Sequence, residues 1–261
     1  MSENGAELTF WDHLDELRGA IIHIICAALL CGIFAFVFKD ALFSIVLAPT
    51  NSEFITYTLL NKVASLTGAT VEPFSIELIN TTLASQFLIH MRVAFLAGAL
   101  CASPYIIYCI MRFIAPALYS SERKTVITVV SFAYMMFIIG ILLSYFVIFP
   151  LTFHFLGTYQ VSAKVENLIS LESYISTFVQ MSLLLGLVFE LPMICWLVAK
   201  LGLIKATMMR AYRRHAIVVI LIIAAIITPT ADAFTLALVS LPMWLLYELS
   251  IFIVSRTNKT E

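Results

Sequence analysis

Charged side chains are scarce in this chain of 261 residues. Lysine, arginine, aspartate and glutamate make up only 12% of the sequence, and hydrophobic residues make up 62%, whereas soluble domains carry roughly 25% and 45–50%. The formal net charge of -1 provides no general positive field of the kind that nucleic-acid binding requires. The composition excludes an ordinary cytosolic enzyme and argues against nucleic acid as a partner.

The motifs of common enzyme and metal sites are also missing. The sequence has no His-Glu-x-x-His, Gly-x-Ser-x-Gly, Walker loop or Gly-x-Gly-x-x-Gly. The five histidines are scattered, although metal ligands usually come in paired spacings. The five cysteines lie inside apolar runs without a Cys-x-x-Cys pair, which is typical of small buried side chains. We therefore expect no catalytic residue, no metal site and no cofactor.

Long apolar runs dominate the chain instead. About 20 helical residues are needed to cross roughly 30 Å of hydrocarbon. Six runs are predicted to be membrane spans, at about 20–38, 86–110, 126–149, 173–199, 215–228 and 234–255. The outer loops are then 39–85, 150–172 and 229–233, and the first of these has room for short interfacial helices. The sequence predicts an all-α integral membrane protein of six transmembrane helices in a single domain, 1–261.

The distribution of basic residues predicts the orientation. Six spans place both termini on one side, and that side has 11 Lys and Arg residues against 3 on the other, Lys39, Lys62 and Lys164. The positive-inside rule therefore predicts that both termini are cytoplasmic. The fifth span, 215–228, would make only about 21 Å of helix, so we expect the bilayer to be thinner around it.

Acidic residues at the predicted cytoplasmic face allow two interpretations. In the segment 10–18, apolar positions and the acids Asp12, Asp15 and Glu16 alternate at helical spacing. The segment is either a solvated face anchored by Arg18 or an acidic platform for a basic ligand, because arginine pairs bidentately with carboxylate. Glu122, in the loop before the third span, either complements a helix dipole or joins such a platform.

Ionisable residues inside the spans are candidates for function. Glu190 lies within the fourth span beside Pro192, and a charge there costs on the order of 2.5–3.5 kcal/mol, so it should face a polar cavity or a partner. Glu248 and Arg92 lie nearer the interfaces and could snorkel or pair.

Two alternative functions use these or neighbouring residues. An ion- or proton-coupled small-molecule transporter would use Glu190 and Arg92 and would need a closed polar path. An intramembrane hydrolase would need Ser144 and His154 to lie together, and nothing in the sequence places them so.

An ordered set of motifs runs through nearly the whole chain. It consists of His13-Leu14-Asp15-Glu16-Leu17-Arg18, Ala48-Pro49, Phe113-Ile114-Ala115-Pro116-Ala117-Leu118-Tyr119 with Glu122-Arg123, Tyr145-Phe146-Val147-Ile148-Phe149-Pro150, Phe189-Glu190-Leu191-Pro192, Thr228-Pro229, and Leu241-Pro242 with Glu248. Together with six spans, this order resembles the TatC family, the multispanning subunit of the twin-arginine protein translocase.

The resemblance implies a receptor and scaffold rather than an enzyme. Glu16 and Glu122 would bind the paired arginines of Tat signal peptides. The side chains implied to shape that site are Leu14, Leu17, Arg18, Phe113, Tyr119 and Arg123. Glu190 would face the concave side of a glove-like arrangement of helices and receive the signal peptide or a single-span partner.

The resemblance also implies the setting and the partners. Folded proteins would be exported across the bacterial cytoplasmic membrane by the proton-motive force. The partners would be single-span TatA/TatB-type subunits and further copies of the chain in a receptor complex. Thr228 and Glu248 would belong to the intramembrane partner surface, although Leu236 stands where family members often have a glutamine.

Overall fold

The computed structural model describes residues 10–66, 77–114, 123–160, 162, 167–228 and 232–257, and most of them are helical. The long helices are α1 (Phe10–Val37), α4 (Ser85–Ile114), α5 (Arg123–Leu143), α7 (Leu171–Val188), α10 (Arg213–Ile227) and α11 (Ala233–Thr257). The shorter ones are α2 (Lys39–Val46), the 3₁₀ turn η1 (Ala48–Thr50), α3 (Ile55–Leu66), the π-helical turn η3 (Ser144–Ile148), α6 (Phe149–Thr158), α8 (Leu191–Lys200) and α9 (Ala206–Ala211).

Five helical segments are long and apolar enough to cross a membrane. They are Leu14–Val37, Ser85–Phe113, Val129–Thr158, Leu171–Lys200 and Ala233–Arg256. The fifth predicted span corresponds to α10, whose 15 residues give about 22 Å of helix, less than the hydrocarbon thickness. The shortness expected from the sequence is therefore present, and six spans remain a prediction.

The third span ends later than the sequence predicts. Pro150 was expected to close it at Phe149, but the helix continues through η3 and α6 to Thr158. Proline ends a helix because it lacks an N–H and crowds the carbonyl four residues earlier. Here the π-helical turn widens the backbone just before Pro150, and the freed carbonyl of Phe146 accepts a hydrogen bond from Thr56 Oγ1 instead. The predicted outer loop 150–172 is correspondingly shorter.

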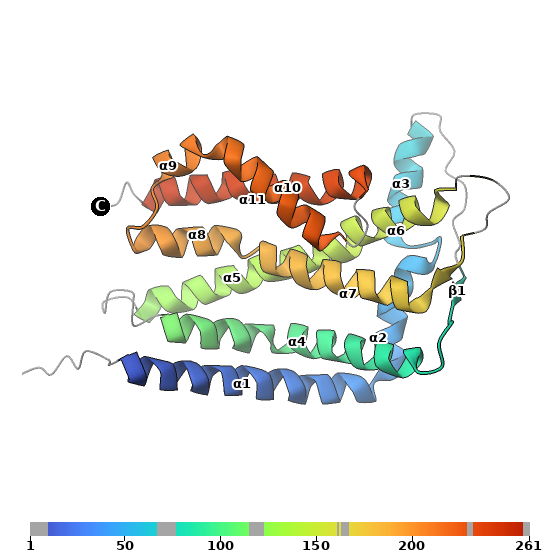
Figure 1. Ribbon diagram of the computed structural model, residues 1–261, viewed down its shortest axis with the longest axis horizontal. Helices are drawn as coiled ribbons and strands as arrows, with labels where there is room; N and C mark the ends of the chain where they lie inside the picture. The colour runs from blue at the N-terminus through green and yellow to red at the C-terminus, as the bar shows by residue number, and fades with distance from the viewer. Residues whose placement is uncertain are drawn as a thin grey trace, which may run out of the picture.

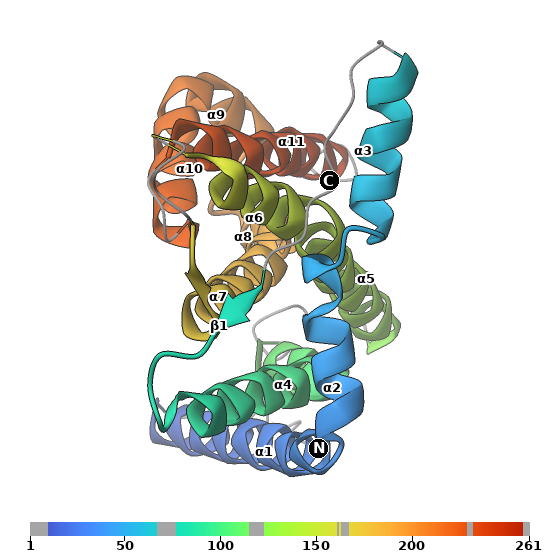
Figure 2. The ribbon, with the colours of Figure 1, turned by 90° about the vertical axis from the view of Figure 1, so that its right-hand side faces the viewer.

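The long helices lie side by side and give the molecule two distinct ends (Figure 1). The end with the start of α1 and the close of α11 is called here the terminal end. The opposite end, the cap end, is closed by α2, α3 and two short strands, β1 (Leu78–Ile79) and β2 (Ile169–Ser170), seen end-on in Figure 2. The strands pair in parallel, with Leu78 opposite Ile169, and join the two outer loops. The expected short helices of the first outer loop are thus α2 and α3.

Helices α1 and α4 pack through small residues. A Cβ atom on Gly98 would lie 2.4 Å from the backbone nitrogen of Gly32 and 2.7 Å from the carbonyl oxygen of Ala28. Glycine lets helix backbones approach this closely, which is how helices associate in lipid without a hydrophobic driving force. Much of the rest of α1 stays exposed, and the helix packs mainly on α4, where Phe36 also stacks on His90 with ring centroids 3.9 Å apart.

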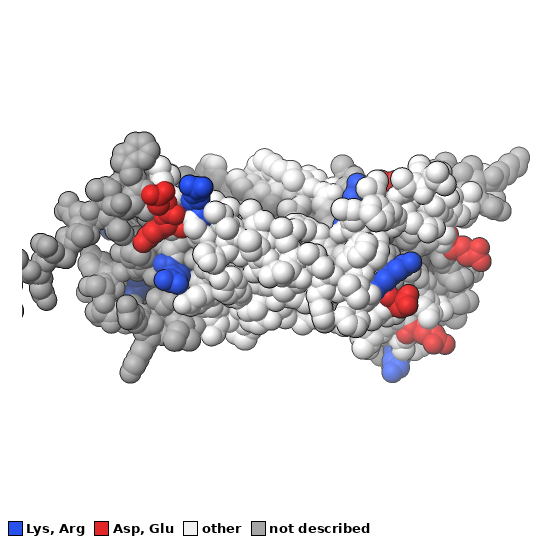
Figure 3. Space-filling model, turned by 90° about the horizontal axis from the view of Figure 1, so that it is seen from below, with Lys and Arg blue, Asp and Glu red and all other residues white. Residues whose placement is uncertain are grey.

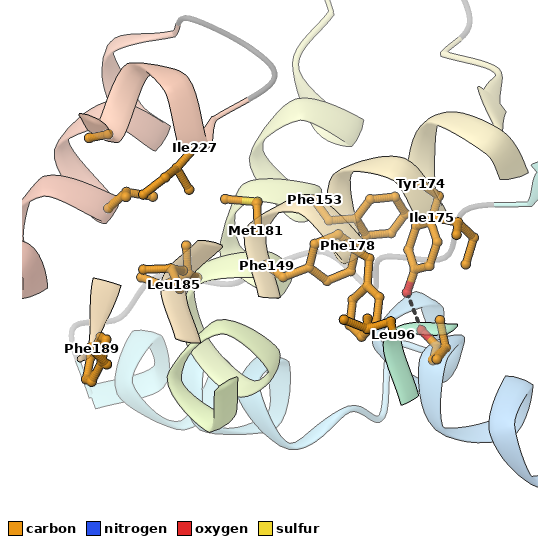
Figure 4. Close-up of a cluster of buried hydrophobic side chains, with 14 of the residues drawn as sticks. Leu96, Phe149, Phe153, Tyr174, Ile175, Phe178, Met181, Leu185, Phe189 and Ile227 are labelled. Atoms are coloured by element: carbon orange, nitrogen blue, oxygen red, sulfur yellow. Dashed lines mark hydrogen bonds between the residues drawn. The ribbon is translucent and has the colours of Figure 1, made fainter. Parts of the chain in front are cut away.

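The core lies toward the cap end, where α6 and α7 meet (Figure 4). The ring centroids of Phe149 and Phe153 lie 5.0 and 4.9 Å from that of Tyr174, at near-perpendicular angles. Phe149 and Phe178 pack similarly at 5.1 Å. Edge-to-face aromatic pairs of this kind contribute about 0.5–1.5 kcal/mol each beyond their burial.

Tyrosine hydroxyl groups fasten the cap to this core. Tyr174 donates to the carbonyl of Val46 at 2.8 Å, the dashed line in Figure 4. Tyr145 donates to Ile45 at 2.7 Å, and Tyr57 to Pro49 at 2.9 Å. These carbonyls lie where α2 ends and η1 begins, so they lack regular helical partners. Burial raises the pKa of Tyr57, which keeps its hydroxyl group a donor.

Candidate functional site

The acidic segment at the start of α1 is helical, as the residue spacing predicts. Leu14, Glu16 and Arg18 are exposed at the terminal end, and Leu17 is half-buried. Glu16 forms no ion pair with any residue that the structure describes. Its carboxylate is therefore available to a cationic ligand.

The other residues implied for this site lie around the loop that follows α4. Phe113 is half-buried in the last turn of α4, which ends at the same end of the bundle as α1 begins. Arg123 is the first residue of α5. Tyr119 and Glu122 lie outside the described residues. The end of α4 and the start of α5, which flank this loop, thus both lie at the terminal end. That Glu16 and Glu122 act together in one site stays a prediction.

On one face of the molecule, charged side chains gather toward the two ends (Figure 3). Figure 3 shows lysine, arginine, aspartate and glutamate gathered at both ends of the visible face, with an uncharged band between them. The described basic residues of the terminal end are Arg18, Arg112, Lys200, Lys205, Arg210, Arg213, Arg214 and Arg256. A charge-free belt between charged ends matches a bilayer core between two headgroup layers.

Glu190 sits at a break between two helices. α7 ends at Val188, Phe189 and Glu190 form a turn, and α8 begins at Leu191 with Pro192 in its first turn. Proline is tolerated there because first-turn N–H groups have no intrahelical acceptor. The fourth span therefore carries a carboxyl at an interruption, as the sequence indicates.

Two glycines hold this break against α5. A Cβ atom on Gly140 would lie 2.8 Å from the Phe189 side chain, and one on Gly186 would lie 2.7 Å from Cδ1 of Ile141. Helices α5 and α7 consequently approach closely at Gly186, about one turn before Glu190, and α5 also contacts Phe189, the residue next to it. These contacts hold the backbone at the break. The sequence analysis did not single out either glycine, because a glycine in an apolar run gives no sign of which neighbour it approaches.

The carboxyl of Glu190 is polar and poorly satisfied. Its Oε1 atom is buried and has no hydrogen-bond partner among the described residues. An unsatisfied buried polar atom costs about 1–3 kcal/mol. Such a cost is typical of a group kept for an external ligand rather than for the fold.

Arg92 does not share a site with Glu190. Its Nη1 atom donates to Ser176 Oγ at 3.0 Å and lies 3.9 Å from Glu172 Oε1, so it joins α4 to α7 near the cap end. Ser176 precedes Glu190 by 14 residues, or about 21 Å along the helix. The transporter alternative, which needs both groups in one polar path, gains no support from this geometry.

Ser144 and His154 are also apart. They lie ten residues from each other on the η3–α6 segment, about 15 Å in helical rise. Ser144 Oγ donates to Ser182 Oγ at 3.4 Å, and the His154 ring packs on Tyr57 with centroids 5.7 Å apart. The pair that a hydrolase would need is not assembled. The described residues also contain no cluster of three or more His, Cys, Asp or Glu side chains suited to a metal ion.

A second polar cluster lies where α10 and α11 meet. Thr228 closes α10 and Thr235 stands in the first turn of α11; both are buried, and their hydroxyl groups have no partner within the described structure. Gln180 of α7 donates its amide to the carbonyl of Ile226 at 3.1 Å, which satisfies one of the last carbonyls of α10. Leu236, which stands where the resemblance implies a glutamine, packs against the hydrophobic core.

Sequence reasoning named Thr228 in this cluster but missed Thr235 and Gln180. Gln180 is an uncharged amide within an apolar run, which is a weaker signal than the ionisable group that led to Glu190. Glu248 pairs with Arg213 at 2.6 Å and joins α11 to α10. Pairing is one of the two roles that its place near the interface predicts.

Comparisons with known proteins agree on one family. Residues 12–242 match the family model of the Sec-independent protein translocase protein TatC. The TatC protein of Blattabacterium sp. subsp. Periplaneta americana is 33% identical over the full length of both chains, and that of Deinococcus radiodurans is 34% identical over 94% of this chain and 85% of its own.

Solved structures extend this agreement to three dimensions. A crystal structure of the twin arginine translocase receptor TatC superposes with a TM-score of 0.76 at 31% identity, covering 94% of this chain and 99% of that one. A crystal structure of the receptor in DDM gives the same TM-score at 30% identity and covers 93% and 99%. From its helices, its ordered motifs and these matches, the chain belongs to the TatC family of Sec-independent protein translocases.

Proposed function

We propose that this chain is the receptor and scaffold of a twin-arginine translocase, and that Glu16 and Glu122 bind the two arginines of a signal peptide. The observation that carries the proposal is the exposed carboxylate of Glu16 at the terminal end, without an ionic partner among the described residues. A guanidinium group forms two parallel hydrogen bonds with a carboxylate, whereas an ammonium group cannot.

The orientation of the site follows from charge. The terminal end carries most of the basic residues, so it belongs on the cytoplasmic side of a bacterial inner membrane, with α10 as the short fifth of six spans. Both termini and the signal-peptide site then face the cytoplasm. The whole chain acts as one membrane domain with a glove-like concave surface, which supports export of folded proteins driven by the proton-motive force.

The intramembrane groups divide the remaining roles. Glu190, at its helix break, receives the hydrophobic part of the signal peptide or a single-span helix. Thr228 and Thr235, whose buried hydroxyl groups have no partner among the described residues, mark the hairpin of α10 and α11 as the side that meets a single-span TatA/TatB-type subunit. Further copies of the chain complete the receptor complex.

The experiment is an export assay in cells that depend on this chain for twin-arginine export. Glu16→Ala should abolish export of a twin-arginine substrate, while Asp15→Ala, the adjacent acid on the same helix, should retain it. Membrane levels of both variants are compared by immunoblot. Wild-type export by Glu16→Ala, at normal protein level, would contradict the assignment.

A further inference from the structure

Helix α3 carries an apolar stripe that faces no part of the described protein. Ile55, Leu59 and Val63 recur at every fourth residue and are 55%, 56% and 60% exposed. Residues four apart lie on one face of a helix, so the three side chains form a continuous strip. The helix lies across the direction of the long helices at the cap end (Figures 1 and 2).

The other faces of α3 have different partners. Tyr57 is buried against the core and donates to Pro49 and Pro150. Exposed polar side chains occupy the arc between Tyr57 and the Ile55 edge of the stripe: Thr58, Asn61, Lys62 and Ser65. The helix therefore has a protein face, an apolar face and a water-compatible face.

Hydrogen bonds to the third span set the tilt of these faces. That span runs outward from the terminal end, so Phe146 lies nearer the membrane centre than Pro150, by about 6 Å of helical rise. Thr56 bonds the carbonyl of Phe146, whereas Tyr57 bonds that of Pro150. On the helix surface Thr56 lies between Tyr57 and the stripe. The stripe is thus turned toward the membrane centre, and the polar arc is turned away from it.

The stripe also continues an apolar surface that the spans already present. Phe146, whose carbonyl accepts a hydrogen bond from Thr56 of α3, is 38% exposed on the third span. Three aliphatic side chains are too few for a stable protein interface, which needs about 800 Å² per partner. An amphipathic helix with a narrow apolar face beside a polar face suits the lipid interface.

We infer that α3 is an interfacial anchor whose Ile55–Leu59–Val63 stripe lies in the outer leaflet of the bilayer and holds the cap at a fixed depth. The inference depends on membrane insertion of the bundle and not on signal-peptide binding. The stripe contacts the acyl chains of the lipids, and the polar arc lies in the headgroup layer.

Spin labels test the inference. Single cysteines are introduced by Leu59→Cys and Val63→Cys, with Asn61→Cys and Ser65→Cys as matched controls on the polar arc, in a full-length chain whose five native cysteines are replaced by alanine. The protein is reconstituted in vesicles of phosphatidylethanolamine and phosphatidylglycerol. Collision rates are measured with oxygen, which concentrates in lipid, and with a water-soluble nickel chelate.

Labels at 59 and 63 should collide more with oxygen than with the chelate, and labels at 61 and 65 should show the reverse. Preferential collision with the chelate at 59 and 63 would overturn the inference. Protection from both reagents with dipolar broadening between labels would also overturn it, since the stripe would then face a second copy. The spin-label experiment does not involve signal-peptide binding. A chain that fails to bind a signal peptide could therefore still give the expected collision rates.

Discussion

Glu190 combines features that seldom occur together in a helix of a membrane span. The carboxyl lies at a break between α7 and α8, Pro192 follows in the first turn, and Oε1 has no partner among the described residues. Each of these features weakens the isolated protein. Residues that lower the stability of the folded protein are typical of functional sites.

Removing the Glu190 carboxyl should therefore stabilise the protein. Glu190→Leu is expected to raise the free energy of unfolding by about 1–3 kcal/mol, because it removes an unsatisfied buried polar atom. The measurement is thermal unfolding of the purified protein in detergent, with Glu248→Leu as control. Glu248 is paired with Arg213, so its loss should lower stability instead. A lower melting temperature for Glu190→Leu would show that the carboxyl has a structural partner.

The same substitution should separate the two parts of peptide recognition. A signal peptide should still bind Glu190→Leu through its arginines at the terminal end, because Glu16 is unchanged. A photoreactive probe in the hydrophobic segment of the peptide should lose its crosslinks to the chain. Loss of arginine-dependent binding as well would contradict the division of roles.

Single residues were predictable where an ionisable group interrupts an apolar run. Glu190 was found in this way, and the acidic segment that contains Glu16 was found by helical spacing. Thr235 and Gln180 were missed because a hydroxyl or an amide among apolar residues is common and gains meaning only from its neighbours in space.

The stability of the protein should depend on the close packing of α1 against α4. Gly98→Ala places a Cβ atom against the backbone of Gly32, where no side chain can move aside. We expect a destabilisation of about 1–3 kcal/mol or more from this overpacking. Gly19→Ala, on α1 with nothing within 4 Å of the added atom, is the control and should be neutral or slightly stabilising. Melting temperatures in detergent provide the comparison, and equal values for both variants would contradict close packing at Gly98.

The cap depends on the hydroxyl group of Tyr57. Tyr57→Phe removes the donor to Pro49 and Pro150 and takes from the buried Pro49 its hydrogen-bond partner, which should cost about 1–3 kcal/mol locally. Hydrogen exchange of the α3 amides should become faster. Tyr159→Phe, at a residue 64% exposed, should leave that exchange unchanged. Unchanged exchange in Tyr57→Phe would show that the cap is held by packing alone.

The boundaries of elements were harder to predict than their presence. Apolar length identified the long helices, because hydrocarbon thickness sets how many residues a span needs. Pro150 was wrongly taken as an end, since the π-helical turn before it and the hydroxyl group of Thr56 that compensates it come from tertiary structure. The 38 residues between α2 and α4 could be assigned only as a loop with helices, because β1 pairs with a strand far along the chain.

The two ends of the bundle should lie on opposite sides of the membrane. In a chain without native cysteines, Lys205→Cys should react with a membrane-impermeant maleimide only after the cytoplasmic side is opened. Asn61→Cys, on the polar arc of α3, should react in intact cells whose outer membrane is permeabilised. Both residues are exposed, so burial does not limit labelling. Labelling of Lys205→Cys from outside would reverse the orientation derived from basic residues.

The central claim is recognition of paired arginines by Glu16 and Glu122 at one membrane face. The most direct test places a photoreactive amino acid at each of these positions in turn and compares a twin-arginine signal peptide with the same peptide carrying two lysines. We expect crosslinks at both positions with arginines and their loss with lysines, because only the guanidinium group pairs bidentately with a carboxylate. Equal crosslinking of both peptides, or none at either position in correctly inserted protein, would contradict this claim.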